Sequence, residues 1–307
     1  MNLPLGAESS FNTGLYAKAL LEMMDICEAL GDTASVEMYK GWYEDVKKAF
    51  NDSAWDGKWW VRWFDKQGNA YGTNKAKYGK IYCNSQSWSV ISGIATGDRA
   101  VQGMDSLNKL LNTANGVKSS TPGYRGFDPN VGGISTYPPG AKENGGIFLH
   151  TNPWVMIAET ILGRGDKAFQ YYSQINPAAK NTKLDEFESE PYCYPQNILG
   201  DEHKQFGMGR NAWLSGTSSW TYQAATQFII GVRASFKGLI VNPCIPSKWD
   251  GFKVTRKFRG ATYEIEVKNP KHVCKGVAEM IVDGQKIDAD VAPIFTKGIH
   301  KVVVTLG

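Results

Sequence analysis

Hydrophobic periodicity changes character near residue 236, and this change constrains the fold more than any other feature of the sequence. Before it, apolar residues recur at three- and four-residue steps, as on one face of an α-helix. After it, short β-branched runs such as Ala261-Thr-Tyr-Glu-Ile-Glu-Val alternate with turn residues, and Asp283-Gly284 is a hairpin signal. The sequence therefore predicts a helical part, residues 1–235, and a small all-β domain, residues 236–307.

Two amphipathic stretches begin the helical part. The first has apolar residues at helical spacing, at Leu15, Ala19, Met23, Ile26 and Leu30. Gly31 and Asp32 end this helix, and a second stripe follows from Val36 to Phe50. Together they predict an αα-hairpin. Comparable stripes recur at 98–112, 154–163, 166–175 and 218–231.

Long stretches rich in Gly, Pro, Asn and aromatic residues separate the helical patterns, at 51–85, 116–153 and 181–217. Long loops in a compact domain are usually functional. The chain has 10 Trp and 14 Tyr, whose flat faces can stack on sugar rings, although large domains also use such residues in their cores. Helical hairpins separated by aromatic loops suggest a toroid of helices with a site on its loop face.

Charge and cysteine usage exclude several function classes. The net charge of +4 is spread along the chain, which argues against binding to nucleic acid or an anionic membrane. The 5 cysteines are scattered without a C-x-x-C pair, which argues against a disulfide framework and against a metal site of the zinc type. No signal-like segment and no apolar run of about 18 residues is present. We therefore expect a soluble cytoplasmic protein.

The densest candidate site is the segment from Tyr137 to His150. Its two prolines stiffen the backbone and its glycines allow close turns. Lys142, Glu143 and His150 within this frame could hold sugar hydroxyls and an anion together. The alternative is a solvated Lys–Glu pair, with His150 capping a helix.

Two further segments carry polar groups in a constrained setting. The run Trp213-Leu-Ser-Gly-Thr-Ser-Ser-Trp220 precedes a helical pattern, and the start of a helix favours an anion. An ordinary helix cap explains it equally well. The segment 188–196 contains Glu188 and Glu190, which are candidate carboxylates or surface charges. The sequence has no G-x-S-x-G, P-loop or H-E-x-x-H signature.

Four strings, in this order, resemble glycoside hydrolase family 94, and fit its cellobiose and cellodextrin phosphorylases best. They are Tyr137-Pro-Pro-Gly-x-Lys-Glu-Asn-x-Gly-Ile-Phe-x-His150-x-Asn-Pro-Trp154, Glu190-Pro-Tyr-x-Tyr-x-Gln196, Trp213-Leu-x-Gly-Thr217 and Asn242-Pro-Cys-Ile-Pro-Ser-Lys-Trp249. The resemblance extends over nearly the whole chain. It implies a mainly α fold: the second part of an (α/α)6 barrel, followed by a small β-sandwich-like domain.

The resemblance also implies a reaction. Inorganic phosphate attacks the anomeric carbon of a β-1,4-glucobiose or cello-oligosaccharide and releases α-glucose 1-phosphate with inversion. Phosphate is itself the nucleophile, so one acid suffices and no cofactor is needed. The resemblance assigns phosphate binding to His150, Ser215 and Gly216. It assigns sugar binding to Tyr137, Lys142, Glu143 and Gln196.

One departure concerns the proton donor. The family's general acid is an Asp in a Trp-Asn-Asp motif, expected just before the segment that begins at Asn2, hence upstream of Met1. The chain is therefore expected to be the C-terminal portion of a homodimeric enzyme, inactive alone and with an exposed apolar face. The alternatives are an inverting hydrolase that uses Glu143 or Glu188, and a non-catalytic sugar-binding remnant.

Overall fold

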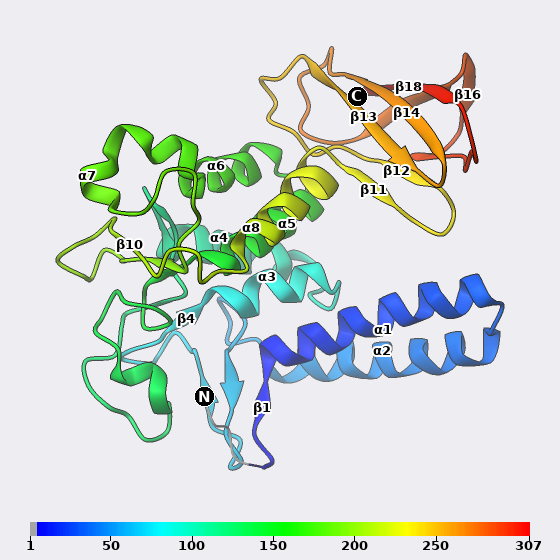
Figure 1. Ribbon diagram of the computed structural model, residues 1–307. Coiled ribbons are helices and arrows are strands. Elements are labelled where there is room, and N and C mark those ends of the chain that lie inside the picture. The colour runs from blue at the N-terminus through cyan, green and yellow to red at the C-terminus, as the bar shows by residue number, and fades with distance from the viewer. Residues whose placement is uncertain (1–4) are drawn as a thin grey trace. The chain divides into compact units, whose positions relative to one another are not determined.

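The computed structural model describes residues 5–307, which form two compact units (Figure 1). The first unit comprises the described residues of Met1–Ala158 together with Ser173–Trp220, and the second comprises Glu159–Tyr172 and Thr221–Gly307. The domain boundary expected between residues 235 and 236 stays a prediction. In the described part of the chain, no helix combines the length and the apolar character that crossing a membrane needs.

A long helical hairpin begins the first unit. It consists of α1 (Ser10–Leu30) and α2 (Thr33–Ser53), each 21 residues long. Gly31 ends α1 in the left-handed conformation at φ 76°, and the Asp32 carboxylate accepts the Ser35 N–H at 3.1 Å to begin α2. Both signals are local, and the predicted αα-hairpin is confirmed.

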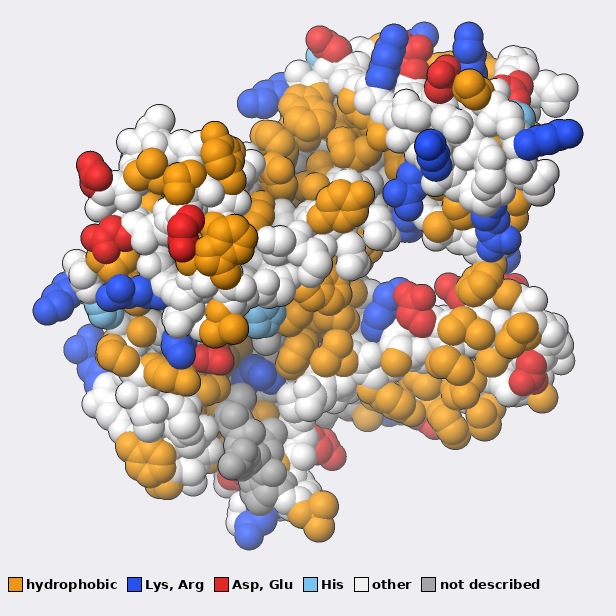
Figure 2. Space-filling model, in the orientation of Figure 1, with side chains coloured by type: hydrophobic (Ala, Val, Ile, Leu, Met, Phe, Trp, Pro, Cys, Tyr) orange, Lys and Arg blue, Asp and Glu red, His pale blue; other side chains and the backbone are white. Residues whose placement is uncertain are grey.

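One side of this hairpin is buried and another is exposed. Ala17 and Leu20 of α1 pack with Phe50 of α2 in a core that also contains Trp60 and Ile94. The exposed apolar side chains on the two helices are Leu15, Tyr16, Met23, Ile26, Leu30, Met38 and Trp42. Figure 2 shows this apolar face over α1 and α2. The self-association that such a face favours stays a prediction.

Short elements make up the rest of the first unit. Its helices are α3 (Cys83–Ile91), α4 (Asp98–Leu111), η1 (Gly132–Thr136), η2 (Leu149–Thr151), η3 (Pro177–Lys183) and α7 (Leu184–Phe187). Its sheets are β1 (Glu8–Ser9), β2 (Trp63–Phe64) and β3 (Ala70–Tyr71); β4 (Ile81–Tyr82) and β7 (Ser120–Thr121); β5 (Asn112–Thr113) and β6 (Gly116–Val117); and β8 (Ile147–Phe148), β9 (Asn197–Ile198) and β10 (Gly209–Arg210). Three helices, α5 (Asn152–Ile161), α6 (Gly165–Ile175) and α8 (Thr217–Gln223), include residues of both units.

The prediction of a mainly α fold, with the second part of an (α/α)6 toroid and a β-sandwich-like domain, is wrong. A toroid needs successive long helices, but the described helices after α4 have 11 residues or fewer. Six small sheets of the described residues separate or follow these helices. The physical reason is that the Gly- and Pro-rich segments at 116–153 and 181–217 cannot continue helices, and they pair instead as two-residue strands.

The second unit is built around two sheets. One has the order β13 (Gly251–Phe258), β14 (Ala261–Lys268), β18 (Ile299–Leu306), β15 (Val277–Val282) and β16 (Gln285–Ile287). The other joins β11 (Val232–Ala234), β12 (Leu239–Val241) and β17 (Val291–Ala292), and the π-helix η4 (Ala224–Ile229) precedes β11. Alternate residues of β14, including Tyr263 and Ile265, are buried in one core. The predicted hairpin turn at Asp283-Gly284 is confirmed between β15 and β16.

Candidate functional site

The segment from Tyr137 to His150 folds into a tight turn. The Gly140 N–H donates to the Asn144 carbonyl at 2.8 Å, and the Gly146 N–H donates to the Lys142 carbonyl at 3.0 Å. Gly140 has φ 82°, and a Cβ atom there would lie 2.6 Å from the His203 backbone nitrogen. A glycine is therefore required at this position by both conformation and space.

The side chain of Asn144 stabilises this turn through hydrogen bonds. It is fully buried, accepts the Tyr124 N–H at 2.7 Å, and donates to the carbonyls of Tyr124 at 2.9 Å and Tyr137 at 2.7 Å. All of these partners are backbone groups, so Asn144 serves the shape of the loop.

Two serines fix the position of Glu143. The hydroxyls of Ser119 and Ser120 both donate to its backbone carbonyl, at 3.0 Å and 3.3 Å. The carboxylate oxygen Oε2 of Glu143 is buried and has no hydrogen-bond partner among residues 5–307. A buried acceptor left without a partner is costly, and a ligand hydroxyl could satisfy it.

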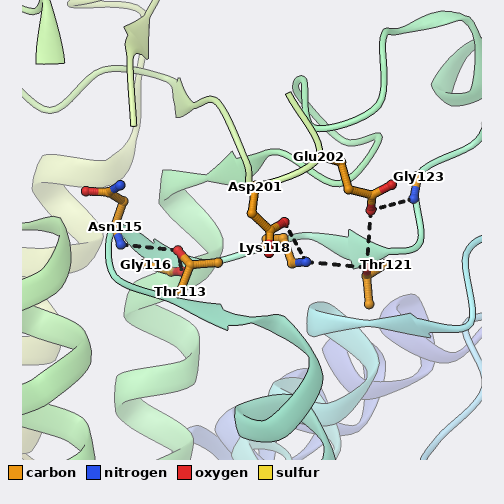
Figure 3. A network of polar contacts seen from close by, with 8 residues as sticks. All are labelled: Thr113, Asn115, Gly116, Lys118, Thr121, Gly123, Asp201 and Glu202. Atoms are coloured by element: carbon orange, nitrogen blue, oxygen red, sulfur yellow. Dashed lines mark hydrogen bonds and ion pairs between the residues drawn. The ribbon is translucent and has the colours of Figure 1, made fainter. Parts of the chain in front are cut away.

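A polar network joins Asp201 and Glu202 to residues 118–123 (Figure 3). The Lys118 ammonium, with its side chain only 6% exposed, pairs with Asp201 at 2.8 Å. The Glu202 carboxylate accepts the Gly123 N–H at 2.9 Å and the Thr121 hydroxyl at 3.3 Å. These contacts tie the loop that contains Asp201 and Glu202 to the strand that supports the turn.

A cavity of about 170 Å³ opens beside Glu143. It lies within the first unit and contains cationic, anionic and hydroxyl side chains. Its lining residues are Arg62, Tyr82, Asn84, Ser119, Ile134, Glu143, Phe148, His150 and Thr151. The cavity thus brings together two residues that the sequence placed in one site, Glu143 and His150.

His150 stands between aromatic rings. Its ring centroid lies 4.7 Å from that of Phe148 and 5.0 Å from that of Trp154, edge to face in both cases. Burial lowers the pKa of His150 from its ordinary value, because a charged imidazole loses hydration there. At neutral pH His150 therefore presents an uncharged imidazole.

The remaining predicted sugar-binding residues surround the turn without lining the cavity. The Lys142 ammonium lies over the Tyr137 ring at 5.1 Å. The Gln196 carbonyl accepts the Leu149 N–H at 3.0 Å, which places Gln196 beside the residue that precedes His150. The Gln196 side-chain oxygen is buried without a partner among the described residues, as is Oε2 of Glu143.

Ser215 and Gly216 precede α8 and do not line this cavity. The Ser215 hydroxyl accepts the Thr217 N–H at 3.1 Å. Trp220 in α8 packs against Trp154 with ring centroids 5.7 Å apart. Trp154 therefore contacts both the His150 ring and the helix that follows Ser215.

The structure sets the other candidate carboxylates apart from the cavity. Glu188 is exposed and ends α7, while Glu190 is exposed and accepts the Trp213 indole N–H at 3.2 Å. In the described part of the chain, no group of three or more His, Cys, Asp or Glu residues could hold a metal ion.

Arg62 is a cavity residue that the sequence reasoning missed. It lies inside the aromatic run Trp59-Trp-Val-Arg-Trp-Phe64, which folds into the core. A charged residue within such an apolar run is unusual, and this could have marked Arg62 as a candidate site residue. Burial lowers the pKa of its guanidinium to about 10, which still leaves it charged at neutral pH. Its Nη1 donates to the Ser9 hydroxyl at 3.0 Å.

Sequence comparison finds phosphorylases among the relatives. The chain is 40% identical over 304 residues to an N,N'-diacetylchitobiose phosphorylase of Vibrio proteolyticus, covering 98% of this chain and 38% of the relative. It is 32% identical over 262 residues to a solabiose phosphorylase of Paenibacillus borealis, covering 85% of this chain and 34% of the relative. The chain thus spans little more than a third of the length of these relatives.

Structural comparison gives a similar fold in a sialidase, with a TM-score of 0.56 over 80% of this chain and 22% of the other. The identity is 11%, so this likeness concerns the fold alone. The model of the glycosyl hydrolase 94 superfamily catalytic domain matches residues 1–231. With the motifs around the cavity and the phosphorylase relatives, this match shows that the chain belongs to the glycosyl hydrolase 94 superfamily.

Proposed function

We propose that this chain is part of an inverting disaccharide phosphorylase. The observation that carries the proposal is one cavity with an unpartnered carboxylate oxygen, on Glu143, and an imidazole, on His150. Sugar hydroxyls suit the first group and a phosphate oxygen suits the second. Relatives named as phosphorylases support the same reaction class.

The proposed substrate is a β-linked disaccharide of glucose or N-acetylglucosamine. The motifs favour cellobiose or a cello-oligosaccharide, whereas the name of a 40% identical relative favours diacetylchitobiose. Phosphate is the only co-substrate required, since it replaces the activated water of a hydrolase. No further cofactor is proposed.

For phosphate we propose His150, Ser215 and Gly216. A neutral imidazole with a lowered pKa can donate one N–H to phosphate, and it gains a proton more readily once a dianion is bound. The Ser215 hydroxyl can donate to an anion while it accepts the Thr217 N–H.

For sugar we propose Tyr137, Lys142, Glu143 and Gln196. The side chains of Glu143 and Gln196 each have a buried oxygen that no described residue satisfies. These two unsatisfied oxygens lie near the turn formed by residues 137–150 and can accept hydrogen bonds from sugar hydroxyls. Lys142 over the Tyr137 ring combines a donor with an apolar face.

We place the general acid outside this chain, in a longer parent protein, because the chain spans only 38% of a 40% identical relative. The segment where the sequence expects it, before Asn2, lies outside the described residues. The chain alone is therefore expected to bind ligands without turnover. A homodimeric parent and a cytoplasmic location stay predictions.

The test uses the longer parent protein with cellobiose and with diacetylchitobiose, each with and without phosphate. We expect the sugar 1-phosphate to form from one of them only when phosphate is present. His150→Ala should abolish this product, and His272→Ala, an exposed histidine of the second unit, should leave it unchanged. Release of free sugars without phosphate, unaffected by His150→Ala, would show a hydrolase instead.

A further inference from the structure

Arg62 is held rigidly at the edge of the cavity. Its backbone N–H donates to the Tyr71 carbonyl at 2.7 Å, and its carbonyl accepts the Ser10 N–H at 3.1 Å. Gly72 approaches so closely that a Cβ atom there would lie 2.7 Å from the Arg62 nitrogen. The backbone of Arg62 therefore has little freedom to move.

The side chain of Arg62 lies between aromatic rings. Its guanidinium carbon is 5.5 Å from the centroid of the Phe11 ring and 5.9 Å from that of Tyr82. Such rings attract a cation and at the same time exclude water from it. The Tyr82 hydroxyl forms a hydrogen bond with the Tyr124 hydroxyl at 2.9 Å, and burial raises the pKa of Tyr82 above its ordinary value, so the phenol remains a neutral neighbour.

The charge of Arg62 is not neutralised by the described residues. Within residues 5–307 the guanidinium forms one hydrogen bond, to the neutral Ser9 hydroxyl, and it has no ion-pair partner. Glu143 lines the same cavity, yet the two side chains form no ion pair. A guanidinium has five N–H donors, and leaving a partly buried cation without an anion is unfavourable.

The cavity supplies the complementary neighbours for an anion. His150 and Asn84 line it with Arg62 and can each donate a hydrogen bond. A guanidinium forms parallel hydrogen bonds with two oxygens of a phosphate group, which a single ammonium cannot do. Glu143, on the other hand, would repel an anion placed against it and suits the sugar.

We propose that Arg62 binds the phosphate substrate directly, beside His150, and supplies the positive charge that the neutral imidazole lacks. This inference rests on the proposed function and adds a residue to it. The Phe11 and Tyr82 rings and the backbone hydrogen bonds of Arg62 hold the guanidinium in place before phosphate binds. Binding therefore costs little conformational entropy of this side chain.

The test is a calorimetric titration of the full 307-residue chain with inorganic phosphate at pH 7.5. We expect Arg62→Gln to weaken phosphate binding by about ten- to a hundred-fold, as for loss of a hydrogen bond to a charged group. Arg62→Lys should fall in between, because it keeps the charge without the paired donors. The control is Arg125→Gln, which removes an exposed arginine of the same unit and should bind as the unmodified chain does.

A second measurement needs no variant. Phenylglyoxal modifies arginine, and mass spectrometry can follow Arg62 and Arg125 separately in the unmodified chain. Phosphate should protect Arg62 and leave Arg125 reactive. Equal modification of Arg62 with and without phosphate would overturn the proposal, even if Arg62→Gln failed to fold.

The outcomes also separate this inference from the proposed function. If His150→Gln loses phosphate binding and Arg62→Gln keeps it, the phosphate site stands and the role of Arg62 is overturned. If the unmodified chain binds no phosphate, the phosphate site and the role of Arg62 fail together. If Arg62→Gln alone loses binding, Arg62 is the phosphate ligand and the assignment of His150 fails.

Discussion

The buried side-chain amide of Asn144 pairs with both backbone groups of Tyr124, accepting the N–H at 2.7 Å and donating to the carbonyl at 2.9 Å. The amide thus satisfies the backbone N–H and carbonyl of Tyr124, as the backbone of a neighbouring strand would. It joins two loops whose paired residues are 20 positions apart in the sequence. The turn that presents Glu143 to the cavity is therefore fixed by a side chain that does not line it.

Asn144→Ala should lower the free energy of unfolding by about 2–4 kcal/mol, since it leaves buried backbone groups of Tyr124 and Tyr137 without partners. Urea denaturation followed by tryptophan fluorescence measures this. Asn130→Ala, at an exposed asparagine, is the matched control and should stay within about 0.5 kcal/mol of the unmodified chain. Equal effects of the two changes would contradict the bridging role.

Gly140→Ala should destabilise the chain more than Gly132→Ala does. The two glycines have φ 82° and 76°, so both changes incur a left-handed backbone strain of roughly 1–2 kcal/mol. A Cβ atom at Gly140 would also lie 2.6 Å from the His203 nitrogen, whereas one at Gly132 would meet nothing within 4 Å. We expect a further cost of about 1–3 kcal/mol at Gly140, measured as the difference between the two urea midpoints.

The features that the sequence predicted well are local ones. The hairpin of α1 and α2 follows from the stripe spacing and from Gly31 and Asp32, and the turn at Asp283 and Gly284 follows from the chemistry of that dipeptide. The toroid was wrong because periodicity indicates helix and does not show where short strands interrupt it. The pairing of Ile147 with Ile198, for example, joins residues far apart in sequence.

The candidate site shows the same limit. The motif strings pointed to Glu143 and His150, which the structure places around one cavity. Arg62 comes from a segment about 80 residues earlier, and only the fold brings it there. Asn144 lay inside a motif, and the sequence could not distinguish its bonds to Tyr124 from a role in ligand binding.

Lys118 and Asp201 should be strongly coupled in a double-mutant cycle. Asp201→Ala leaves the ammonium of Lys118, whose side chain is 6% exposed, with only a long contact to Thr121 at 3.4 Å. We expect this change to cost about 1–3 kcal/mol in the unmodified chain, and much less when Lys118 is first changed to Met. Additive effects in urea denaturation would show that the pair contributes nothing specific.

The second unit should lose stability at high pH through His300. Its Nδ1 lies 2.6 Å from the Asp283 carboxylate, and this hydrogen bond, with a second to the Lys297 carbonyl, raises the pKa of His300 above its ordinary value. The folded unit therefore binds the proton more tightly than the unfolded chain does. The stabilisation is complete below pH 6.5 and is lost as pH rises through the folded pKa.

Asp283→Asn tests this sign, because the amide oxygen can still accept the Lys301 N–H while the charge is removed. The stability difference between the unmodified chain and this variant should be larger at pH 6 than at pH 9. An NMR titration of the His300 ring should also show its pKa falling in the variant. A difference that does not change with pH would contradict the assignment.

His150 predicts the opposite pH dependence for the first unit. Burial lowers the pKa of His150 in the folded state, so below pH 6.5 the unfolded chain binds the proton first. Stability should therefore fall as pH drops from 6.5 toward the folded pKa, and His150→Gln should lose less stability over that interval.

Sulfate, which stays a dianion throughout, should raise the His150 pKa when bound, since a nearby negative charge favours the protonated ring. Its affinity for the chain should accordingly increase as pH falls, and calorimetry at pH 7.5 and pH 5.5 measures this. A sulfate affinity that is the same at both pH values would place the anion away from His150.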